Sequence, residues 1–311
     1  MRIVFMGTPE SAVPSLRRLL DDGHEIIAVW TQPDKPAGRG NKLHQPPVKE
    51  FALRHNLIVH QPAKIKTQEA KTLFASREAD AAIVVAYGKI LPTEFLGAPR
   101  NGCINVHFSL LPKYRGAAPV NWAIVKGERE TGVTTMKIVE ELDTGPILLQ
   151  RQTAINEHET APQLLARLAE IGAELLSETL KRFDNIQAQP QRDEEATFAP
   201  MLKREDGLID WSMDAFAIER RVRGFQPWPN AYTTFSSRRL IIWQATAEKN
   251  DQLNGSPGQI VEAHGDNIRV ACAEKTTLRL LELQIENGRR MSARDFLNGT
   301  HAKVGGMLGR V

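Results

Sequence analysis

Apolar residues in the first half of the chain fall into short runs that alternate with patterns of helical spacing. The runs predict strands at Arg2–Phe5, Glu25–Trp30, Ala81–Val85, Gly102–His107, Thr134–Val139 and Ile147–Gln152. The patterns between them predict helices at Glu10–Asp22, Val48–His55, Thr67–Arg77 and Ala117–Lys126. This alternation is typical of an α/β fold with an open, mostly parallel sheet and helices on both faces.

The strongest helical pattern is Thr160–Phe183, where Leu164, Leu168 and Leu175 belong to one apolar face. The composition then changes, because the following segment is polar and carries Pro190 and Pro200. We therefore expect a first domain over residues 1–189, a linker over 190–205 and a second domain over 206–311.

The second half has one predicted helix and several short strands separated by turn signals such as Asn254-Gly255. The helix is expected at Ser212–Arg223, and the strands at Ala231–Phe235, Leu240–Ala245, Gly258–Glu262, Ile268–Ala271 and Leu278–Leu283. Short strands at this spacing predict a small β-barrel of the OB type. Trp211, Trp228 and Trp243 are expected in its core.

Composition excludes several classes of protein. Hydrophobic residues make up 41% and charged residues 25%, which is the balance of a globular domain rather than a disordered chain. The two cysteines exclude a disulfide scaffold and fit a reducing compartment, so we expect a cytoplasmic protein. No apolar run approaches the ~20 residues of a membrane span, and no membrane partner is expected. The net charge of +3 neither requires nor excludes a nucleic-acid partner.

The turn after the first strand argues against a dinucleotide or ATP site. It reads Gly7-Thr-Pro-Glu-Ser-Ala12, so the second and third glycines of the dinucleotide fingerprint are missing, and Pro9 removes an amide donor. No P-loop is present. The eight histidines have no metal-ligand spacing, so no metal is expected.

Three polar residues stand where an α/β sheet binds ligands. Asn105 and His107 end a predicted strand and are two residues apart, so they point to the same side of it. Asp143 lies in the Leu-Asp-Thr-Gly loop after the strand Thr134–Val139. Taken singly, each has an ordinary structural interpretation as a turn residue or a buried histidine. Together they predict a catalytic group.

An amide, an imidazole and a carboxylate are suited to acyl transfer onto an amine. Asn105 would donate a hydrogen bond to the developing oxyanion. His107 would donate to the oxyanion or accept a proton, and Asp143 would hold the imidazole in one tautomer and stabilise its charged form. No Ser or Cys nucleophile is needed if the amine attacks directly.

The motif Asn105-x-His-x-Ser-Leu-Leu-Pro112, followed by Leu142-Asp-Thr-Gly145, resembles the folate-dependent formyltransferases. Matching segments occur along the whole chain, among them Thr31–Gly40, Val85–Pro92, Arg115–Pro119, Ile209–Trp211 and Phe225–Pro229. The resemblance is closest to the members that formylate methionine on initiator tRNA. Phe108, where a small residue is more usual, and Glu141, where a glycine is usual, depart from the pattern and would crowd the folate site.

The resemblance implies 10-formyltetrahydrofolate as the donor and initiator methionyl-tRNA as the acceptor. It implies Asn105, His107 and Asp143 as the catalytic residues. It also implies a Rossmann-like formyltransferase domain followed by an OB-like β-barrel that binds tRNA. We further expect no metal and a monomeric chain. The residues expected to bind folate are Ser109, Leu110, Leu111, Pro112, Tyr87, Gly88 and Ile90.

A cationic loop and arginine clusters favour an RNA acceptor. Lys35, Arg39 and Lys42 lie in the Pro- and Gly-rich loop after the second predicted strand, and the resemblance assigns them to the tRNA acceptor stem. The second domain has 14 basic and 12 acidic residues, so RNA binding by this domain is predicted from clusters of basic residues and not from its net charge. The clusters are Arg220, Arg221 and Arg223; Arg238 and Arg239; and Arg289, Arg290 and Arg294.

Three alternatives stay open from the sequence. The first is formyl transfer to a small amine, such as glycinamide ribonucleotide or an amino sugar, although the extra domain and the cationic loop favour tRNA. The second is an RNA-binding protein that has lost catalysis, which the intact trio argues against. The third is folate-dependent deformylation by water, which the same trio would also support.

Overall fold

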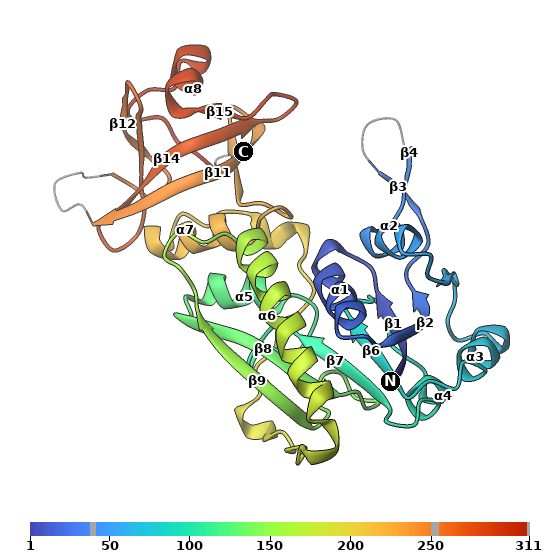
Figure 1. Cartoon of the computed structure of the whole chain (residues 1–311). Helices are drawn as coiled ribbons and strands as arrows, with labels where there is room; N and C mark the ends of the chain where they lie inside the picture. The colour runs from blue at the N-terminus through green and yellow to red at the C-terminus, as the bar shows by residue number, and fades with distance from the viewer. Residues whose placement is uncertain (38–41, 250–254, 310–311) are drawn as a thin grey trace. The chain divides into compact units, whose positions relative to one another are not determined.

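The structure is a computed structural model, which describes residues 1–37, 42–249 and 255–309 (Figure 1). The chain forms two compact units, which are described separately below. The first unit comprises Met1–Gly116, Glu130–Ala154 and Leu165–Ala199, and the second comprises Ala117–Arg129, Ile155–Leu164 and Pro200–Val311. The division therefore falls after Ala199, and two earlier segments group with the C-terminal part of the chain.

The first unit is built on a seven-stranded sheet of order β5-β2-β1-β6-β7-β8-β9. The first five strands in this order run parallel, whereas β8 and β9 are antiparallel to their neighbours. The strands are β1 (Arg2–Gly7), β2 (Glu25–Trp30), β5 (Val59–His60), β6 (Ala81–Val85), β7 (Cys103–His107), β8 (Glu130–Lys137) and β9 (Ile147–Ala154). A short hairpin, β3 (Lys35–Ala37) with β4 (Lys42–His44), stands apart from this sheet.

Helices cover the sheet because its central strands are apolar on both faces. All five residues of β6 are buried, as the unbroken apolar run predicts. The helices that belong to this unit at least in part are α1 (Val13–Asp21), α2 (Pro47–Arg54), α3 (Gln68–Ala75), α4 (Thr93–Gly97) and α6 (Ala161–Lys181). Gly172 lets α6 pack closely on the sheet, since a Cβ there would lie 2.9 Å from Val106.

The strand order places a topological switch point between β1 and β6. The chain moves from β1 to β2 on one side and to β6 on the other, so the loops after these strands separate at the carboxyl edge of the sheet. Open α/β sheets bind ligands at this edge. The loops that meet there begin at Thr8, Thr31, Ala86 and Phe108.

The second unit contains a six-stranded antiparallel sheet of order β10-β11-β14-β13-β12, with β15 paired to β14. The strands are β10 (Tyr232–Phe235), β11 (Arg238–Lys249), β12 (Ile260–His264), β13 (Asn267–Ala271), β14 (Thr276–Ile285) and β15 (Met291–Ser292). The helices are α5 (Pro119–Lys126), α7 (Ala215–Gly224) and α8 (Ala293–Thr300). The small β domain that was predicted as an OB-type barrel is confirmed as an antiparallel sheet; among its described strands, no ladder joins β12 to β10.

The positions of the tryptophans in this unit differ from one another. Trp211 is buried in the core and donates a hydrogen bond to Thr233 Oγ1, as expected. Trp228 is 53% exposed, so its expected place in the core was wrong. Trp243 is partly buried beneath the guanidinium of Arg290, whose Cζ lies 4.9 Å from the ring centre. Trp228 lies between two cis peptide bonds, Gln226–Pro227 and Trp228–Pro229, which the sequence pattern did not reveal.

Candidate active site

Asn105 and His107 lie on β7 and face the same side of the sheet, because side chains two residues apart share a face. His107 is only 6% exposed, whereas Asn105 is half-buried. Among the described residues, no group forms a hydrogen bond with the Asn105 side chain. The amide is therefore available to a ligand at the edge of the sheet.

The tautomer of the neutral His107 ring is set by a backbone carbonyl. Its Nε2 lies 3.0 Å from the carbonyl oxygen of Tyr114, which can only accept a hydrogen bond. Nε2 therefore carries the proton and donates it, which leaves Nδ1 without a proton in the neutral ring. We predicted that Asp143 holds the tautomer, but in this structure the Tyr114 carbonyl does so.

The Asp143 carboxylate faces the other ring nitrogen. Its Oδ2 lies 3.8 Å from His107 Nδ1, which is within ion-pair distance but too long for a hydrogen bond. The same oxygen accepts a hydrogen bond of 2.8 Å from the backbone N–H of Gly116. Gly145 is required two residues later, since a Cβ there would lie 1.8 Å from the Lys137 carbonyl oxygen. The Asp-Thr-Gly turn thus folds back and fixes the carboxylate beside the imidazole.

A distant glutamine holds the Asp143 loop in place. The side-chain amide of Gln191 donates hydrogen bonds of 2.8 Å to the backbone carbonyls of Asp143 and Gly145. Its oxygen accepts a hydrogen bond of 3.0 Å from the guanidinium of Arg115, which is itself 5% exposed and paired with Asp193. Sequence analysis missed Gln191 because the segment around it has the composition of a linker.

The segment from Ser109 to Pro112 is held by buried hydroxyl groups. Thr134 Oγ1 donates to the Ser109 carbonyl at 2.7 Å and accepts from the Leu111 N–H at 3.1 Å. Ser109 Oγ is engaged with the Lys113 carbonyl at 2.6 Å, and the Leu111–Pro112 peptide bond is cis. Ser109 and Leu111 are buried, whereas Leu110 is only partly so. A ligand beside this segment would therefore meet mainly its backbone.

The loop after β6 also offers mainly its backbone. The Tyr87 side chain is 1% exposed, and burial raises the pKa of its phenol to about 12. Its carbonyl accepts hydrogen bonds of 3.1 Å from Thr8 Oγ1 and Gln32 Nε2. Gly88 has φ +79°, a conformation that favours glycine, and Ile90 is 71% exposed. Of these three predicted contacts, only Ile90 presents its side chain to solvent.

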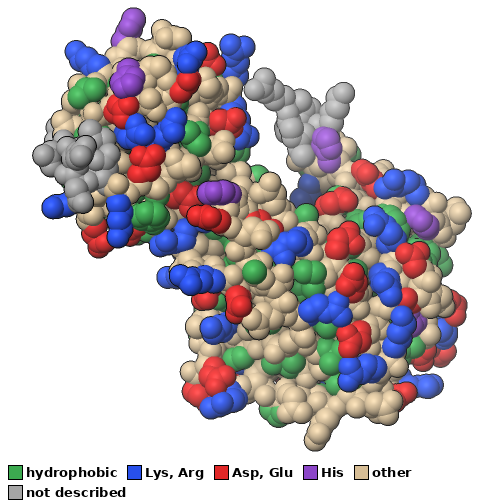
Figure 2. Space-filling model, turned by 60° about the vertical axis from the view of Figure 1, so that its left-hand side comes forward, with side chains coloured by type: hydrophobic (Ala, Val, Ile, Leu, Met, Phe, Trp, Pro, Cys, Tyr) green, Lys and Arg blue, Asp and Glu red, His purple; other side chains and the backbone are tan. Residues whose placement is uncertain are grey.

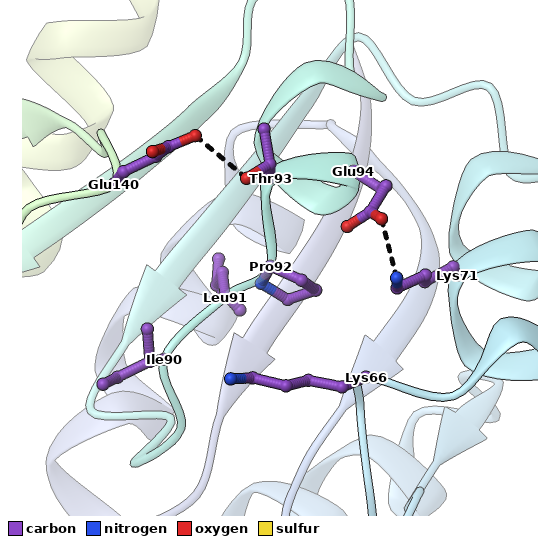
Figure 3. A pocket seen from close by; sticks show the side chains of 8 residues that line it. All are labelled: Lys66, Lys71, Ile90, Leu91, Pro92, Thr93, Glu94 and Glu140. Atoms are coloured by element: carbon purple, nitrogen blue, oxygen red, sulfur yellow. Dashed lines mark hydrogen bonds and ion pairs between the residues drawn. The ribbon is translucent and has the colours of Figure 1, made fainter.

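An open pocket of about 310 Å³ lies next to this loop (Figure 3). The Lys66 side chain extends below Pro92 toward Ile90 in this view. Two interactions cross the rim of the pocket. Lys71 forms an ion pair with Glu94 at 2.6 Å, and the Thr93 hydroxyl donates a hydrogen bond of 2.9 Å to Glu140. The pocket joins the loop after β6 to the loop that carries Asp143, because Glu140 belongs to the latter.

The predicted cationic residues are only partly described. Lys35 on β3 is exposed, and its ammonium has no hydrogen-bond or ion-pair partner in the described part of the chain. Arg39 and the Lys42 side chain lie outside the described residues. Within the same limits, no group of three or more His, Cys, Asp or Glu residues is arranged to hold a metal ion. No helix in the described ranges is long and apolar enough to cross a membrane.

The Thr134 hydroxyl predicts a specific effect on stability. Thr134→Val keeps the side-chain shape but leaves the Ser109 carbonyl and the Leu111 N–H without partners in the interior. Because each such loss costs about 1–3 kcal/mol, we expect the unfolding free energy to fall by about 2–4 kcal/mol in chemical denaturation. Thr131→Val on the same strand is the matched control, since Thr131 is also buried but no described group bonds its hydroxyl. Equal losses in the two variants would contradict this account.

The Gln191 side chain predicts a local effect on the Asp143 loop. Gln191→Leu removes the two donors that hold residues 143–145, so backbone amides in residues 142–146 should exchange hydrogen at least tenfold faster by mass spectrometry. Gln187→Leu is the matched control, because Gln187 is exposed and its side chain has no described partner. Unchanged exchange in Gln191→Leu would show that the loop holds its own conformation.

Comparison with known proteins gives a consistent assignment. The Formyl transferase family matches residues 1–180, and the family described as Formyl transferase, C-terminal domain, matches residues 201–301. The chain is 47% identical to the methionyl-tRNA formyltransferase of Citrifermentans bemidjiense, covering 100% of this chain and 97% of that protein. It is 49% identical to the enzyme of the same name from Caldanaerobacter subterraneus subsp. tengcongensis, covering 99% and 100%.

Solved structures share the fold at low sequence identity. The sugar 3N-formyl transferase WlaRD superimposes with a TM-score of 0.68 at 19% identity, covering 93% of this chain and 99% of that chain. HypX from Aquifex aeolicus, solved with tetrahydrofolic acid, gives a TM-score of 0.65 at 19% identity, covering 98% and 48%. The family matches and the full-length relatives together show that this chain belongs to the formyl transferases and, within them, to the methionyl-tRNA formyltransferases.

Proposed function

We propose that this chain transfers the formyl group of 10-formyltetrahydrofolate to the α-amine of methionine on initiator tRNA, with Asn105, His107 and Asp143 as its catalytic residues. Formyl transfer to methionyl-tRNA is the activity of the family to which the chain belongs. The observation that carries the residue assignment is the meeting of an unengaged amide, an imidazole with a free Nδ1 and a fixed carboxylate at one sheet edge.

The reaction requires stabilisation of an oxyanion. The methionine amine attacks the formyl carbon, a new C–N bond forms and the carbonyl oxygen becomes negatively charged. The bond from the formyl carbon to the folate nitrogen then breaks, and that nitrogen takes up a proton. Asn105 is the proposed oxyanion donor, because its amide is not engaged with the protein and faces the edge of the sheet.

His107 is the proposed proton carrier for the attacking nitrogen. Its Nε2 is bonded to the Tyr114 carbonyl, so Nδ1 is the ring atom that can accept a proton. Asp143 lies beside Nδ1 and would stabilise the imidazolium by charge, as in other imidazole–carboxylate pairs. This arrangement assigns orientation of the ring to Tyr114 and charge stabilisation to Asp143.

Folate is the proposed formyl donor, bound against backbone groups. The structural neighbours HypX and WlaRD were solved with tetrahydrofolic acid and 5-N-formyl-THF, respectively, and share this fold. We assign the binding surface to Ser109, Leu110, Leu111 and Pro112 together with Tyr87, Gly88 and Ile90. Phe108 is 8% exposed, which supports binding without the crowding expected from its size.

We choose the proposed tRNA contacts in the second unit among its basic side chains that form no ion pair with a described acidic residue. In Figure 2, basic and acidic side chains are interspersed over the visible face, so clustering alone is a weak guide. Among the described residues, Arg223 pairs with Glu219, Arg290 with Glu282 and Arg294 with Asp266. Many of the clustered arginines therefore serve the fold.

Two arginines of the second unit stay available. Arg238 and Arg289 are exposed, and their guanidinium groups have no partner in the part of the chain that the structure describes. They approach the same end of the β11–β14 ladder, in which Leu240 pairs with Ile285. We propose that Arg238 and Arg289, with Lys35, Arg39 and Lys42 of the first unit, contact tRNA phosphates.

We also propose that the chain is a cytoplasmic monomer. Cys103 and Cys272 are both buried free thiols, and burial raises the pKa of each to about 12. Such thiols resist oxidation, and their unpaired state fits a reducing compartment.

The activity is tested by incubating the protein with 10-formyltetrahydrofolate and, separately, methionyl-initiator and methionyl-elongator tRNA. We expect formyl-methionine on the initiator tRNA and at least tenfold less on the elongator. Release of formate without formyl-methionine would instead support deformylation by water. Formylation of glycinamide ribonucleotide or an amino sugar in preference to tRNA would support a small-amine acceptor.

The role of Asn105 is tested by Asn105→Ala. We expect kcat to fall by about 10²–10³, the usual cost of one oxyanion donor, with an almost unchanged melting temperature because the amide has no protein partner. Asn185→Ala, at an exposed position, is the matched control and should leave both quantities unchanged. A near-normal rate with a large thermal loss would mean that Asn105 is structural.

A further inference from the structure

The switch point between β1 and β6 contains a cavity that touches the proposed folate surface only at Tyr87 and Gly88. Its other lining residues have no role in the proposed catalytic site. The cavity has a volume of about 330 Å³, within the range of about 300–1,000 Å³ in which small ligands bind. The segments that line it follow β1, β2 and β6 and precede α2. The cavity therefore occupies the position where an open α/β sheet most often takes a ligand.

The walls of this cavity are rigid and largely apolar. Four prolines line it: Pro9, Pro33, Pro46 and Pro47. Proline rings offer apolar surfaces and lose little conformational freedom on binding, which suits contact with an aromatic ring system.

The Gln32 side chain has one polar atom without a partner. The Gln32 amide donates both of its N–H groups, to the Tyr87 and Gly88 carbonyls, each at 3.1 Å. Because both partners are carbonyls, the nitrogen must face them, and Oε1 points elsewhere. In the described part of the chain no group donates to this oxygen. The Thr8 hydroxyl is engaged with the Tyr87 carbonyl, which leaves Gln32 Oε1 as an acceptor beside the prolines. The His44 and Gln45 side chains, which are exposed, also line the cavity without a described partner.

The rim of the cavity carries uncompensated positive charge. Lys35 lines the cavity and has no described partner, and its charge contributes, after burial, to lowering the pKa of Lys89. The nearby Asp34 carboxylate does not neutralise it, because it is bonded to Lys49 at 2.7 Å and to Gln61 at 2.8 Å. Lys35 also begins the β3–β4 hairpin, whose residues are proposed to contact tRNA.

The distance from the catalytic strand fits an aminoacyl nucleoside. β1 and β7 are separated by two strand spacings, which is about 10 Å. In an aminoacyl nucleoside, the carboxyl group of the amino acid is esterified to the ribose. About seven covalent bonds then separate the α-amine from the base, a span of roughly 8–10 Å. A base in the cavity would therefore allow its amino acid to reach Asn105 and His107.

We propose that this cavity binds the terminal adenosine of the acceptor tRNA, with the adenine between the proline walls, its exocyclic amine donating to Gln32 Oε1 and its phosphate beside Lys35. This inference depends on the proposed function, since it names a subsite for the acceptor.

The test compares two methionylated initiator tRNAs, one ending in adenosine and one ending in purine riboside, which lacks only the exocyclic amine. We expect kcat/KM to fall about tenfold for the second tRNA, the usual effect of one hydrogen bond in an apolar pocket. The KM for 10-formyltetrahydrofolate should not change. Gln32→Leu should use both tRNAs equally, whereas the matched control Gln68→Leu, at an exposed helix position, should keep the tenfold preference.

A second measurement on the unaltered protein covers the case in which Gln32→Leu does not fold. Adenosine 5′-monophosphate should inhibit competitively against methionyl-tRNA but not against 10-formyltetrahydrofolate, and purine riboside 5′-monophosphate should inhibit more weakly. Equal use of the two tRNAs by the unaltered protein, or competition of the nucleotide with folate, would overturn the inference. Failure to formylate the adenosine-ended tRNA would instead refute the proposed function.

Discussion

The hydrogen bond from His107 Nε2 to the Tyr114 carbonyl determines which ring nitrogen is available for chemistry. The neutral imidazole carries its proton on Nε2 and donates it to this carbonyl, so Nδ1 has no proton and faces Asp143. The carbonyl can hold this position because the Tyr114 N–H is bonded to Thr197 Oγ1 at 2.9 Å. The chemistry of one side chain thus depends on backbone that is fixed from a segment more than 80 residues away.

The same principle applies across the site. Side chains with reactive atoms are few, and most of the surrounding surface is backbone held by buried polar groups. Thr134 holds the Ser109–Pro112 segment, Gln32 holds the loop after β6, and Gln191 holds the Asp143 turn. Each of these groups satisfies donors or acceptors that would otherwise be buried without partners, so the energy that shapes the site also stabilises the fold.

Sequence patterns were sufficient for the sheet and for the identity of the candidate trio. The runs Glu25–Trp30 and Ala81–Val85 coincide with β2 and β6, because strands covered on both faces have an unbroken apolar signal. The β3–β4 hairpin and the two-residue β5 give no such signal, and α4 is too short for a periodic pattern. The catalytic roles of Asn105, His107 and Asp143 stay predictions until activity is measured. Gln191, the Tyr114 carbonyl and the switch-point cavity could not be predicted, since each depends on contacts between segments with no local sequence signature.

The course of the chain has a consequence for how it can be divided. It passes between the compact units after residues 116, 129, 154, 164 and 199. Helix α5, encoded well before the polar segment, donates from Asn121 to the Gly224 carbonyl at 2.7 Å, and Trp122 packs edge-on against Phe225. Cleavage of the chain, or splitting of its gene, within residues 190–205 would therefore not yield two halves that fold independently. The N-terminal fragment would carry helix α5, whose packing partner is encoded in the other fragment.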